Sequence, residues 1–402
     1  MTSVSVRSDE LARALPGRSQ RAGAAKTSPV RDLLALTERP EVISFAGGLP
    51  APELFDLDGI RSSYDEVLRT RSVLQYSTSE GNRALREEVA RRYSADGLPT
   101  SAADLIITTG SQQGLGLLAT CLLDPGDTIL VEEPCYLAAL QTFALAGARV
   151  IGVPYAGEEL DLEALERLAA EHAPKFFYTV PTFQNPTGRS HGVDARARIA
   201  ASARRHGFRI IEDEPYRQLR YSGEPLPSLA SFAPEHVLSL GSFSKVIAPG
   251  LRIGWIRTTK DLHPTVLIAK QAADLHTSTI DQAAAAHYLL SGRGEPALEV
   301  IRRAYGERRD AMLAALPAAM PSGTTWNSPD GGMFVWVRLP EGRNAAAALP
   351  DALARDVAFV PGAPFFAGPA DERTLRLSFT TYEPDTIRTG LSRLGAAWGG
   401  AG

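Results

Sequence analysis

Short apolar runs alternate with longer amphipathic stretches along the first three quarters of the chain. Seven runs rich in valine, isoleucine and leucine predict strands at 105–108, 128–131, 149–153, 176–180, 209–211, 237–240 and 253–256. They show little polar alternation, which is typical of strands buried on both faces. Helix-like stretches lie between them at 114–123, 137–145, 162–171 and 195–206. This β-α-β rhythm predicts an α/β fold with a mostly parallel, seven-stranded sheet covered by helices.

The pattern changes after about residue 295. A long helix is expected over 296–316, followed by a strand at 333–339, a helical stretch at 345–356, a short run at 358–360 and a strand at 374–378. These elements predict a smaller α+β unit, and a chain of 402 residues is long enough for two domains. We therefore expect a large domain over 51–294 and a small domain over 295–402. Residues 1–50 would form an N-terminal arm and part of the small domain.

Composition narrows the function classes. The net charge is -4 and the pI about 6.0, so no basic excess points to nucleic acid or an anionic membrane. No apolar run is long enough to span a bilayer, and the first residues lack the continuous apolar region of a secretory signal. Cys121 and Cys135 form no disulfide framework, and the histidines show no metal-ligand spacing. We expect a cytoplasmic protein without a metal.

Two polar motifs follow predicted strands, at the edge of an open α/β sheet where ligands bind. Residues 109–114 (Thr-Gly-Ser-Gln-Gln-Gly) open a helix, whose free amides suit a phosphate group. Residues 181–188 form a turn in which Asn185 can point into a crevice. Taken singly, the first is better explained by an ordinary helix cap at Ser111, and the second by a turn that happens to contain asparagine.

Two further motifs carry charge. Asp213 ends an apolar strand, where it could hold a proton on a heteroaromatic nitrogen or belong to a solvated acidic turn. Residues 241–245 (Gly-Ser-Phe-Ser-Lys) precede Arg252, and serine and arginine suit a phosphate dianion. Lysine is scarce, and Lys245 would form an imine with a carbonyl group. A basic surface loop is the alternative, but no helical stripe or charge-rich context explains these cations.

The ordered set resembles the fold type I, class I/II aminotransferases that depend on pyridoxal 5′-phosphate (PLP). Within them the chain looks most like the 2-aminoadipate/kynurenine aminotransferase II subgroup. The resemblance covers nearly the whole chain, and these stretches carry it: 43–50, 75–77, 109–113, 183–188, 241–252, 274–277 and 331–334. It implies an aspartate aminotransferase-like fold and a homodimer with shared active sites.

The resemblance also implies roles for individual residues. Lys245 would be the Schiff-base lysine and proton carrier, and Asp213 would pair with the pyridine nitrogen. Asn185 and Tyr216 would bind the phenolic oxygen of the cofactor, while Tyr136 would stack on its ring as a third catalytic residue. The phosphate would be surrounded by Ser111, Gln112, Ser242, Ser244 and Arg252, with Tyr76 of the partner subunit. The substrate would meet Arg376, Gly47, Gly48, Asn185, Ser28 and Arg31.

Two of these substrate roles have ordinary alternatives. Arg376 lies between two leucines on a predicted strand, and such an arginine usually points to solvent. Arg31 would pair with an acidic substrate side chain or swing away for an apolar or aromatic one; the alternative is a solvated helix charge near Pro29.

The sequence thus predicts an aminotransferase that moves an amino group between an L-amino acid (2-aminoadipate, leucine-like or aromatic) and a 2-oxo acid such as 2-oxoglutarate, by a ping-pong mechanism. One alternative is another PLP reaction in specialised biosynthesis, such as oxidation, elimination or cyclisation, because the same lysine and aspartate serve all of them. The other is the effector domain of a PLP-binding transcription regulator. Only some forty residues precede Ile43, and they are not strongly basic, which disfavours it.

Overall fold

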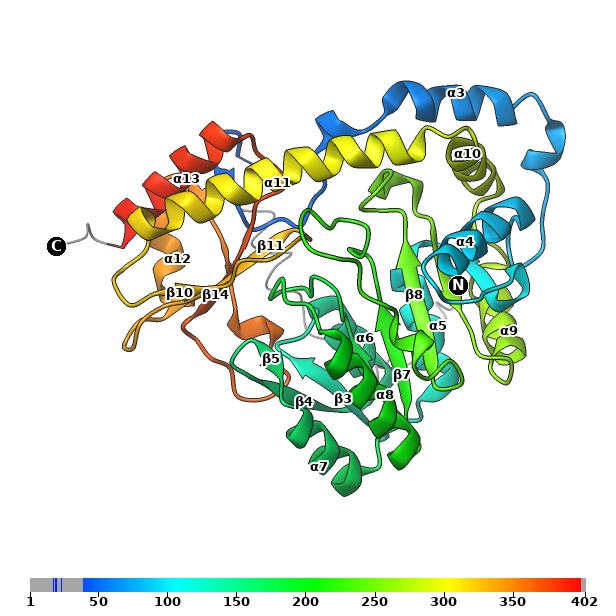
Figure 1. Cartoon of the computed structure of the whole chain (residues 1–402), viewed down its shortest axis with the longest axis horizontal. Coiled ribbons are helices and arrows are strands. Elements are labelled where there is room, and N and C mark those ends of the chain that lie inside the picture. The colour runs from blue at the N-terminus through cyan, green and yellow to red at the C-terminus, as the bar shows by residue number, and fades with distance from the viewer. Residues whose placement is uncertain (1–16, 18, 20–22, 24–38, 399–402) are drawn as a thin grey trace, which may run out of the picture.

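A twisted sheet of eight strands forms the centre of the larger part of the molecule (Figure 1). The computed structural model describes residues 39–398 together with Gly17, Ser19 and Gly23. In spatial order the strands are β2 (Leu105–Thr108), β9 (Gly254–Arg257), β8 (Val237–Ser242), β7 (Arg209–Asp213), β6 (Phe176–Thr179), β3 (Thr128–Glu133), β4 (Arg149–Ala156) and β5 (Glu159–Leu160). The five strands from β8 to β4 run parallel to one another, whereas the pairs β2–β9, β9–β8 and β4–β5 are antiparallel.

This arrangement confirms the predicted mostly parallel sheet, and all seven expected strands are present. The eighth strand, β5, was not predicted. It has only two residues, which fold back on the end of β4 through a turn at Gly157, so it produces no apolar run in the sequence.

Apolar side chains cover both faces of this sheet, which explains the lack of polar alternation in its strands. Phe176 and Tyr178 of β6 pack into a cluster on one face, whereas Phe177 packs into a second cluster on the other. Helices α5 (Gly110–Leu122) and α6 (Leu137–Ala146) belong to the first cluster. Helices α7 (Leu162–His172) and α8 (Val193–His206) belong to the second.

Local chemistry sets several helix ends. The Asp161 side chain accepts a hydrogen bond from the backbone N–H of Ala164 and so caps the start of α7. Helix α8 ends at His206 and is capped by Gly207, whose φ of +74° is in the left-handed region that favours glycine. The remaining helices of this part are α3 (Leu57–Val67), α4 (Arg83–Ala95), α9 (His263–Asp274) and α10 (Thr279–Leu290).

A second, antiparallel sheet is formed mainly by the last third of the chain. Its strands are, in order, β10 (Thr325–Trp326), β11 (Phe334–Arg338), β14 (Thr374–Ser378) and β13 (Val360–Pro361). Near the start of the described chain, β1 (Ile43–Ser44) pairs in parallel with β12 (Val357–Ala358). Helices α12 (Ala345–Leu353) and α13 (Pro384–Ala397) complete this part.

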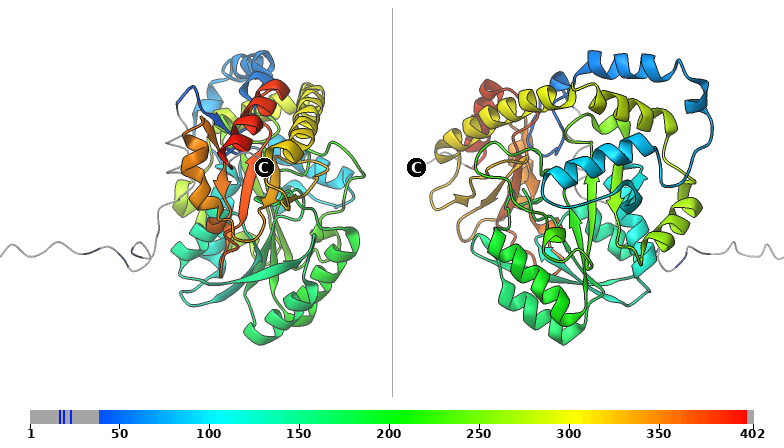
Figure 2. Two further views of the ribbon diagram at one scale, coloured as in Figure 1. Left: turned by 90° about the vertical axis from the view of Figure 1, so that its left-hand side faces the viewer. Right: turned by 45° about the vertical axis from the view of Figure 1, so that its right-hand side comes forward.

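Helix α11 (Gly294–Ala319) connects the two sheets along one side of the molecule, with α13 packed against it (Figures 1 and 2). It is longer than the expected 296–316 because its last turn continues past Pro317. Within the described residues, no helix is both long and apolar enough to cross a membrane, and no cluster of histidine, cysteine and acidic side chains could hold a metal ion.

Candidate active site

A cavity of about 300 Å³ lies at the carboxyl ends of the central parallel strands, between the two sheets. This is where an open α/β sheet offers a ligand site, and the size suits a small-molecule cofactor. The lining residues are Gly48, Ser111, Gln112, Tyr136, Val180, Asn185, Asp213, Pro215, Tyr216, Ser242, Ser244, Lys245, Pro249, Arg252, Phe334 and Arg376. Twelve of the sixteen site residues expected from the sequence are among them: Gly48, Ser111, Gln112, Tyr136, Asn185, Asp213, Tyr216, Ser242, Ser244, Lys245, Arg252 and Arg376.

Lys245 lies just beyond β8, with its amine facing the cavity. Its Nζ donates a hydrogen bond to the carbonyl oxygen of Gly48, 2.9 Å away and 197 residues earlier in the chain. Burial lowers the pKa of Lys245 to about 8, and the positive charges of Arg376 and Arg252 add to this effect. A substantial fraction of the amine is therefore neutral near pH 8, as a nucleophile or a general base must be.

Asp213 is the last residue of β7 and is only 4 % exposed. Its Oδ2 accepts a hydrogen bond from the hydroxyl of Tyr178 at 2.9 Å, whereas Oδ1 is buried and has no hydrogen-bond partner in the described part of the chain. Burial raises the pKa of Asp213 to about 6, and the bond from Tyr178 opposes that rise. An unpartnered, buried carboxylate oxygen beside the cavity is what a protonated ring nitrogen of a ligand would need.

Arg376 comes from the other sheet, on β14. It is 4 % exposed, so the solvent-facing alternative for this arginine is wrong. Its guanidinium donates to Asn185 Oδ1 at 2.7 Å and to the carbonyl oxygen of Ala46 at 2.6 Å. The rings of Phe334 and Phe365 flank it, with their centroids 4.3 and 5.2 Å from the guanidinium carbon. Burial lowers the pKa of Arg376 to about 10, so it remains cationic at neutral pH and can bind a carboxylate.

Hydroxyl, amide and guanidinium groups gather at the start of α5. Ser242 Oγ donates to Ser244 Oγ at 2.9 Å, and Arg252 Nη1 lies 3.5 Å from the same Ser244 oxygen. Gly110, with a φ of +75°, opens α5 close to Arg252, where a Cβ would lie only 2.5 Å from Nη2. Backbone amides at a helix start, two hydroxyls and an arginine form a donor set that suits a phosphate dianion.

Four expected site residues are not among those that line the cavity. Gly47 is buried next to Gly48. Tyr76 is 79 % exposed on the surface of this chain, with its ring edge-on to His276 at 5.9 Å. Ser28 and Arg31 lie outside the described residues, so their proposed contacts with substrate stay predictions.

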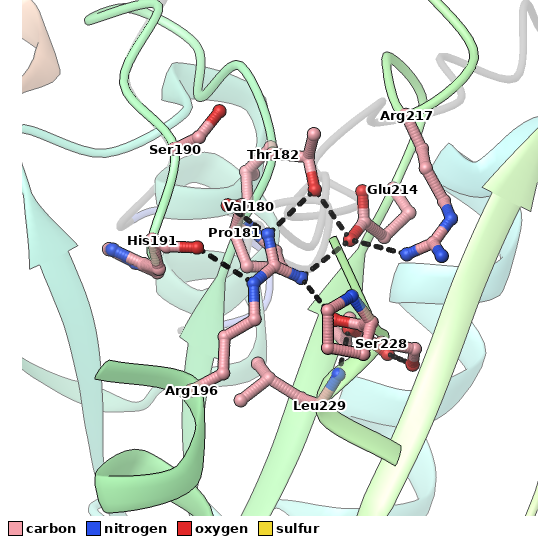
Figure 3. A network of polar contacts seen from close by, with 12 residues as sticks. Val180, Pro181, Thr182, Ser190, His191, Arg196, Glu214, Arg217, Ser228 and Leu229 are labelled. Carbon is pink, nitrogen blue, oxygen red and sulfur yellow. Dashed lines mark hydrogen bonds and ion pairs between the residues drawn. The ribbon is translucent and has the colours of Figure 1, made fainter. Parts of the chain in front are cut away.

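A buried ionic network lies next to Val180, one of the residues that line the cavity (Figure 3). Arg196 of α8 is fully buried, and its guanidinium donates to the carbonyl oxygens of His191, Pro227 and Pro181 and to Thr182 Oγ1, at 2.7–2.9 Å. Glu214 Oε1 accepts from Thr182 at 2.9 Å and lies 3.5 Å from Arg196. The network therefore joins the loop that carries Asn185 to the segment that carries Asp213 and Tyr216.

The sequence reasoning missed both Arg196 and Tyr178. Tyr178 could have been identified from the sequence, because a tyrosine inside an apolar strand needs a buried acceptor for its hydroxyl. Arg196 could not, since it lies among other arginines on α8, such as Arg198 and Arg204, that pair with exposed acidic side chains.

The family model for aminotransferase class I and II matches residues 51–394. A 2-aminoadipate transaminase from Thermus thermophilus is 42% identical over 382 residues, which cover 94% of this chain and 95% of the relative. An aromatic-amino-acid aminotransferase from Thermococcus litoralis is 42% identical over 388 residues, covering 94% and 92%. The crystal structure of a Pyrococcus horikoshii kynurenine aminotransferase in complex with PMP, the amino form of PLP, matches with a TM-score of 0.90 and 39% identity, covering 94% of this chain and 96% of that one.

Proposed function

Because this chain belongs to the aminotransferase class I and II family, we propose that it moves the amino group of a large L-amino acid (2-aminoadipate, leucine-like or aromatic) to 2-oxoglutarate. The chain is a PLP-dependent aminotransferase of amino acids. The named substrates of its relatives and the lining of the cavity support this choice of donor and acceptor.

The observation that carries the proposal is the meeting of four groups in one cavity: the Lys245 amine, the unpartnered Asp213 oxygen, the phosphate-type donor set around Arg252, and Arg376. When bound, PLP supplies an electron sink that weakens the Cα–H bond of the amino acid. Asp213 would hold the proton of the pyridine nitrogen, while Asn185 and Tyr216 would bind the phenolic oxygen. Tyr136 would cover the ring. Ser111, Gln112, Ser242, Ser244 and Arg252 would hold the phosphate.

The substrate would be oriented by Arg376, whose fork can take the α-carboxylate in a bidentate manner. Gly47 and Gly48 would border the substrate, with Asn185 beside it. Lys245 would carry the α-proton, because its depressed pKa leaves the amine partly neutral near pH 8. The kinetics would be ping-pong, with the oxo acid product leaving before the acceptor enters the same cavity.

Preference for a large donor is supported by the aromatic rings around Arg376. Phe334 lines the cavity and Phe365 packs beside it, so an apolar or aromatic side chain would be desolvated there. The described cations that line the cavity are Lys245, Arg252 and Arg376. An acidic donor such as 2-aminoadipate would therefore draw on Arg31, with Ser28, which is the role proposed for the N-terminal arm.

We also propose a homodimer in the cytoplasm. Tyr76 is exposed on the isolated chain, and the proposed contact of its hydroxyl with the phosphate requires a second subunit. Both described cysteines are free, as expected in a reducing compartment.

An amino-donor screen with 2-oxoglutarate tests the proposal. Glutamate should form with 2-aminoadipate, leucine or phenylalanine as donor, and parallel plots of reciprocal rates should report the ping-pong order. Production of an oxo acid without an amino acceptor, with oxygen consumed, would instead identify an oxidase and refute transamination as the main reaction. Pyruvate and oxaloacetate serve as alternative acceptors, and faster turnover with either would correct the acceptor alone.

A further inference from the structure

A buried tyrosine, Tyr178, touches the catalytic carboxylate from outside the cavity. It is the third residue of β6 and has no exposed surface, and its ring packs against Phe143 at 5.5 Å between centroids. A hydroxyl in such an apolar layer must find an acceptor. The acceptor is Oδ2 of Asp213 on the neighbouring strand β7, at 2.9 Å.

The two oxygens of Asp213 are therefore not equivalent. Oδ2 is held by Tyr178, and Oδ1 is buried without a partner among the described residues. No other side chain in the described part of the chain donates a hydrogen bond to this carboxylate. We propose that Tyr178 is a positioning residue, which keeps Asp213 ionised and aims its free oxygen at the pyridine nitrogen of the cofactor. The inference rests on the PLP site proposed above.

Electrostatics supports this role. Burial raises the pKa of Asp213, the hydrogen bond from Tyr178 lowers it, and the two together leave it at about 6. A neutral Asp213 could not balance a pyridinium charge, and the electron sink would weaken. The other titratable groups around this pair are Cys135 and Tyr136 from the β3–α6 connection and Tyr216 after β7, with Arg376 and Arg252 across the cavity.

Pyridoxamine 5′-phosphate (PMP) is a suitable probe, because it has no aldehyde and cannot condense with Lys245. Its affinity for the apoenzyme should fall as the pH drops and Asp213 takes up a proton. We call this fall of PMP affinity on acidification the acid limb. In Tyr178→Phe the folded-state pKa of Asp213 rises, so the acid limb should move to higher pH. A lost hydrogen bond to a charged group is worth about ten- to a hundredfold, which corresponds to a shift of roughly one to two pH units. Protonation of PMP itself is the same for both proteins and cancels from the difference.

Tyr64→Phe is the matched control. Tyr64 of α3 donates its hydroxyl to Asp281 of α10, so the change removes another Tyr–Asp hydrogen bond away from the cavity-lining residues. It should leave the acid limb in place. An Asp213→Asn variant has no carboxyl group at this position, so its PMP affinity should show no acid limb. Adding Tyr178→Phe to this variant should change PMP affinity by less than about twofold.

The outcomes separate the two proposals. If Asp213→Asn leaves PMP affinity and its pH dependence unchanged, the PLP site itself is misassigned. If Asp213→Asn weakens PMP but folded Tyr178→Phe keeps the wild-type limb, the role of Tyr178 is overturned and the site stands. If Tyr178→Phe does not fold, replacement of Tyr178 by 3-fluorotyrosine keeps the ring and strengthens the donor. The limb should then move to lower pH, and an unmoved limb would overturn the proposal.

Discussion

A substitution of Arg196 tests whether the buried ionic network stabilises the segments that carry the site residues. The change to methionine keeps much of the side-chain length but removes every donor of the guanidinium. Four hydrogen bonds are lost, to His191, Pro227, Pro181 and Thr182, together with the 3.5 Å ion pair to Glu214. Removing one partner of a buried ion pair typically costs about 3–5 kcal/mol, because the other charge is left uncompensated.

Glu214 limits that cost, because it can take up a proton. Burial already raises its pKa to about 7, although the positive charge of Arg196 lowers it. Without Arg196 the folded-state pKa rises further above the ordinary 4.5. A raised folded pKa contributes stability at low pH that is lost as the pH rises through it. The deficit of Arg196→Met relative to wild type should therefore be smallest near pH 6 and largest above pH 8.

Thermal unfolding gives the magnitude. An unfolding entropy of about 2.1 cal/mol/K per residue gives roughly 0.8 kcal/mol/K for a chain of 402 residues, so a loss of 3–5 kcal/mol lowers Tm by about 4–6 °C. The affinity for PLP should also fall, because the loop of Asn185 and the segment of Asp213 and Tyr216 lose their common anchor. Arg196→Lys should fall between wild type and Arg196→Met, since a single ammonium cannot reach all four acceptors.

Arg198→Met is the control for this experiment. It makes the same substitution one half-turn away on α8, where Arg198 pairs with Glu163 at the surface, with side chains 55% and 84% exposed. Such exposed pairs contribute about 0–1 kcal/mol, so Tm should change little. If Arg196→Met is no less stable than Arg198→Met, or if its deficit does not grow with pH, the network does not stabilise the site.

Three further predictions concern the cavity and its partner subunit. The rate at which apoenzyme incorporates PLP, followed by absorbance, should rise with pH with a midpoint near the Lys245 pKa of about 8. A midpoint near the ordinary 10.5 would contradict the lowered pKa. Lys245→Ala should not incorporate PLP covalently at all. Arg376→Lys should reduce kcat/KM for amino acids by about ten- to a hundredfold, since a lysine cannot reproduce the bidentate fork, and near-native kcat/KM would remove Arg376 from substrate binding. Mixed dimers of Tyr76→Phe and Lys245→Ala subunits should contain one intact site and one doubly changed site, so activity should exceed that of either parent; an active monomer by light scattering would refute the shared site.

The strands of the large sheet were predictable because a strand that is buried on both faces has apolar side chains at consecutive positions. The β6 segment reads Phe-Phe-Tyr-Thr, and all four side chains are buried, on alternating faces. The β14 strand was predicted with its observed ends, since Leu375 and Leu377 both face the core. Helix starts were predicted less accurately. Helix α5 begins at Gly110, four residues before the expected start, because the low helix propensity of the glycines at 110 and 114 weakens the helical pattern there.

The cavity residues at the strand ends were predictable for a related reason. Parallel strands end at the same edge of a sheet, so the motifs after β2, β6, β7 and β8 had to meet there. The local sequence pattern could not predict which residues surround each charged side chain. The burial of Arg376 depends on Asn185 and Ala46, which are 191 and 330 residues away in sequence.

These long separations have a physical consequence for the site. A charge buried between distant segments is stable only when both segments are in place, because each isolated partner would carry an uncompensated desolvation cost. Lys245 donates to Gly48, and Arg376 donates to Ala46, so residues just after β1 contribute acceptors to cations from both sheets. Formation of the cavity therefore requires residues 46–48, the large sheet and β14 together. The ordering of this segment should thus follow the docking of the two sheets, and a change at Gly48, where a Cβ would lie 2.8 Å from the Phe334 ring, should disturb both cations at once.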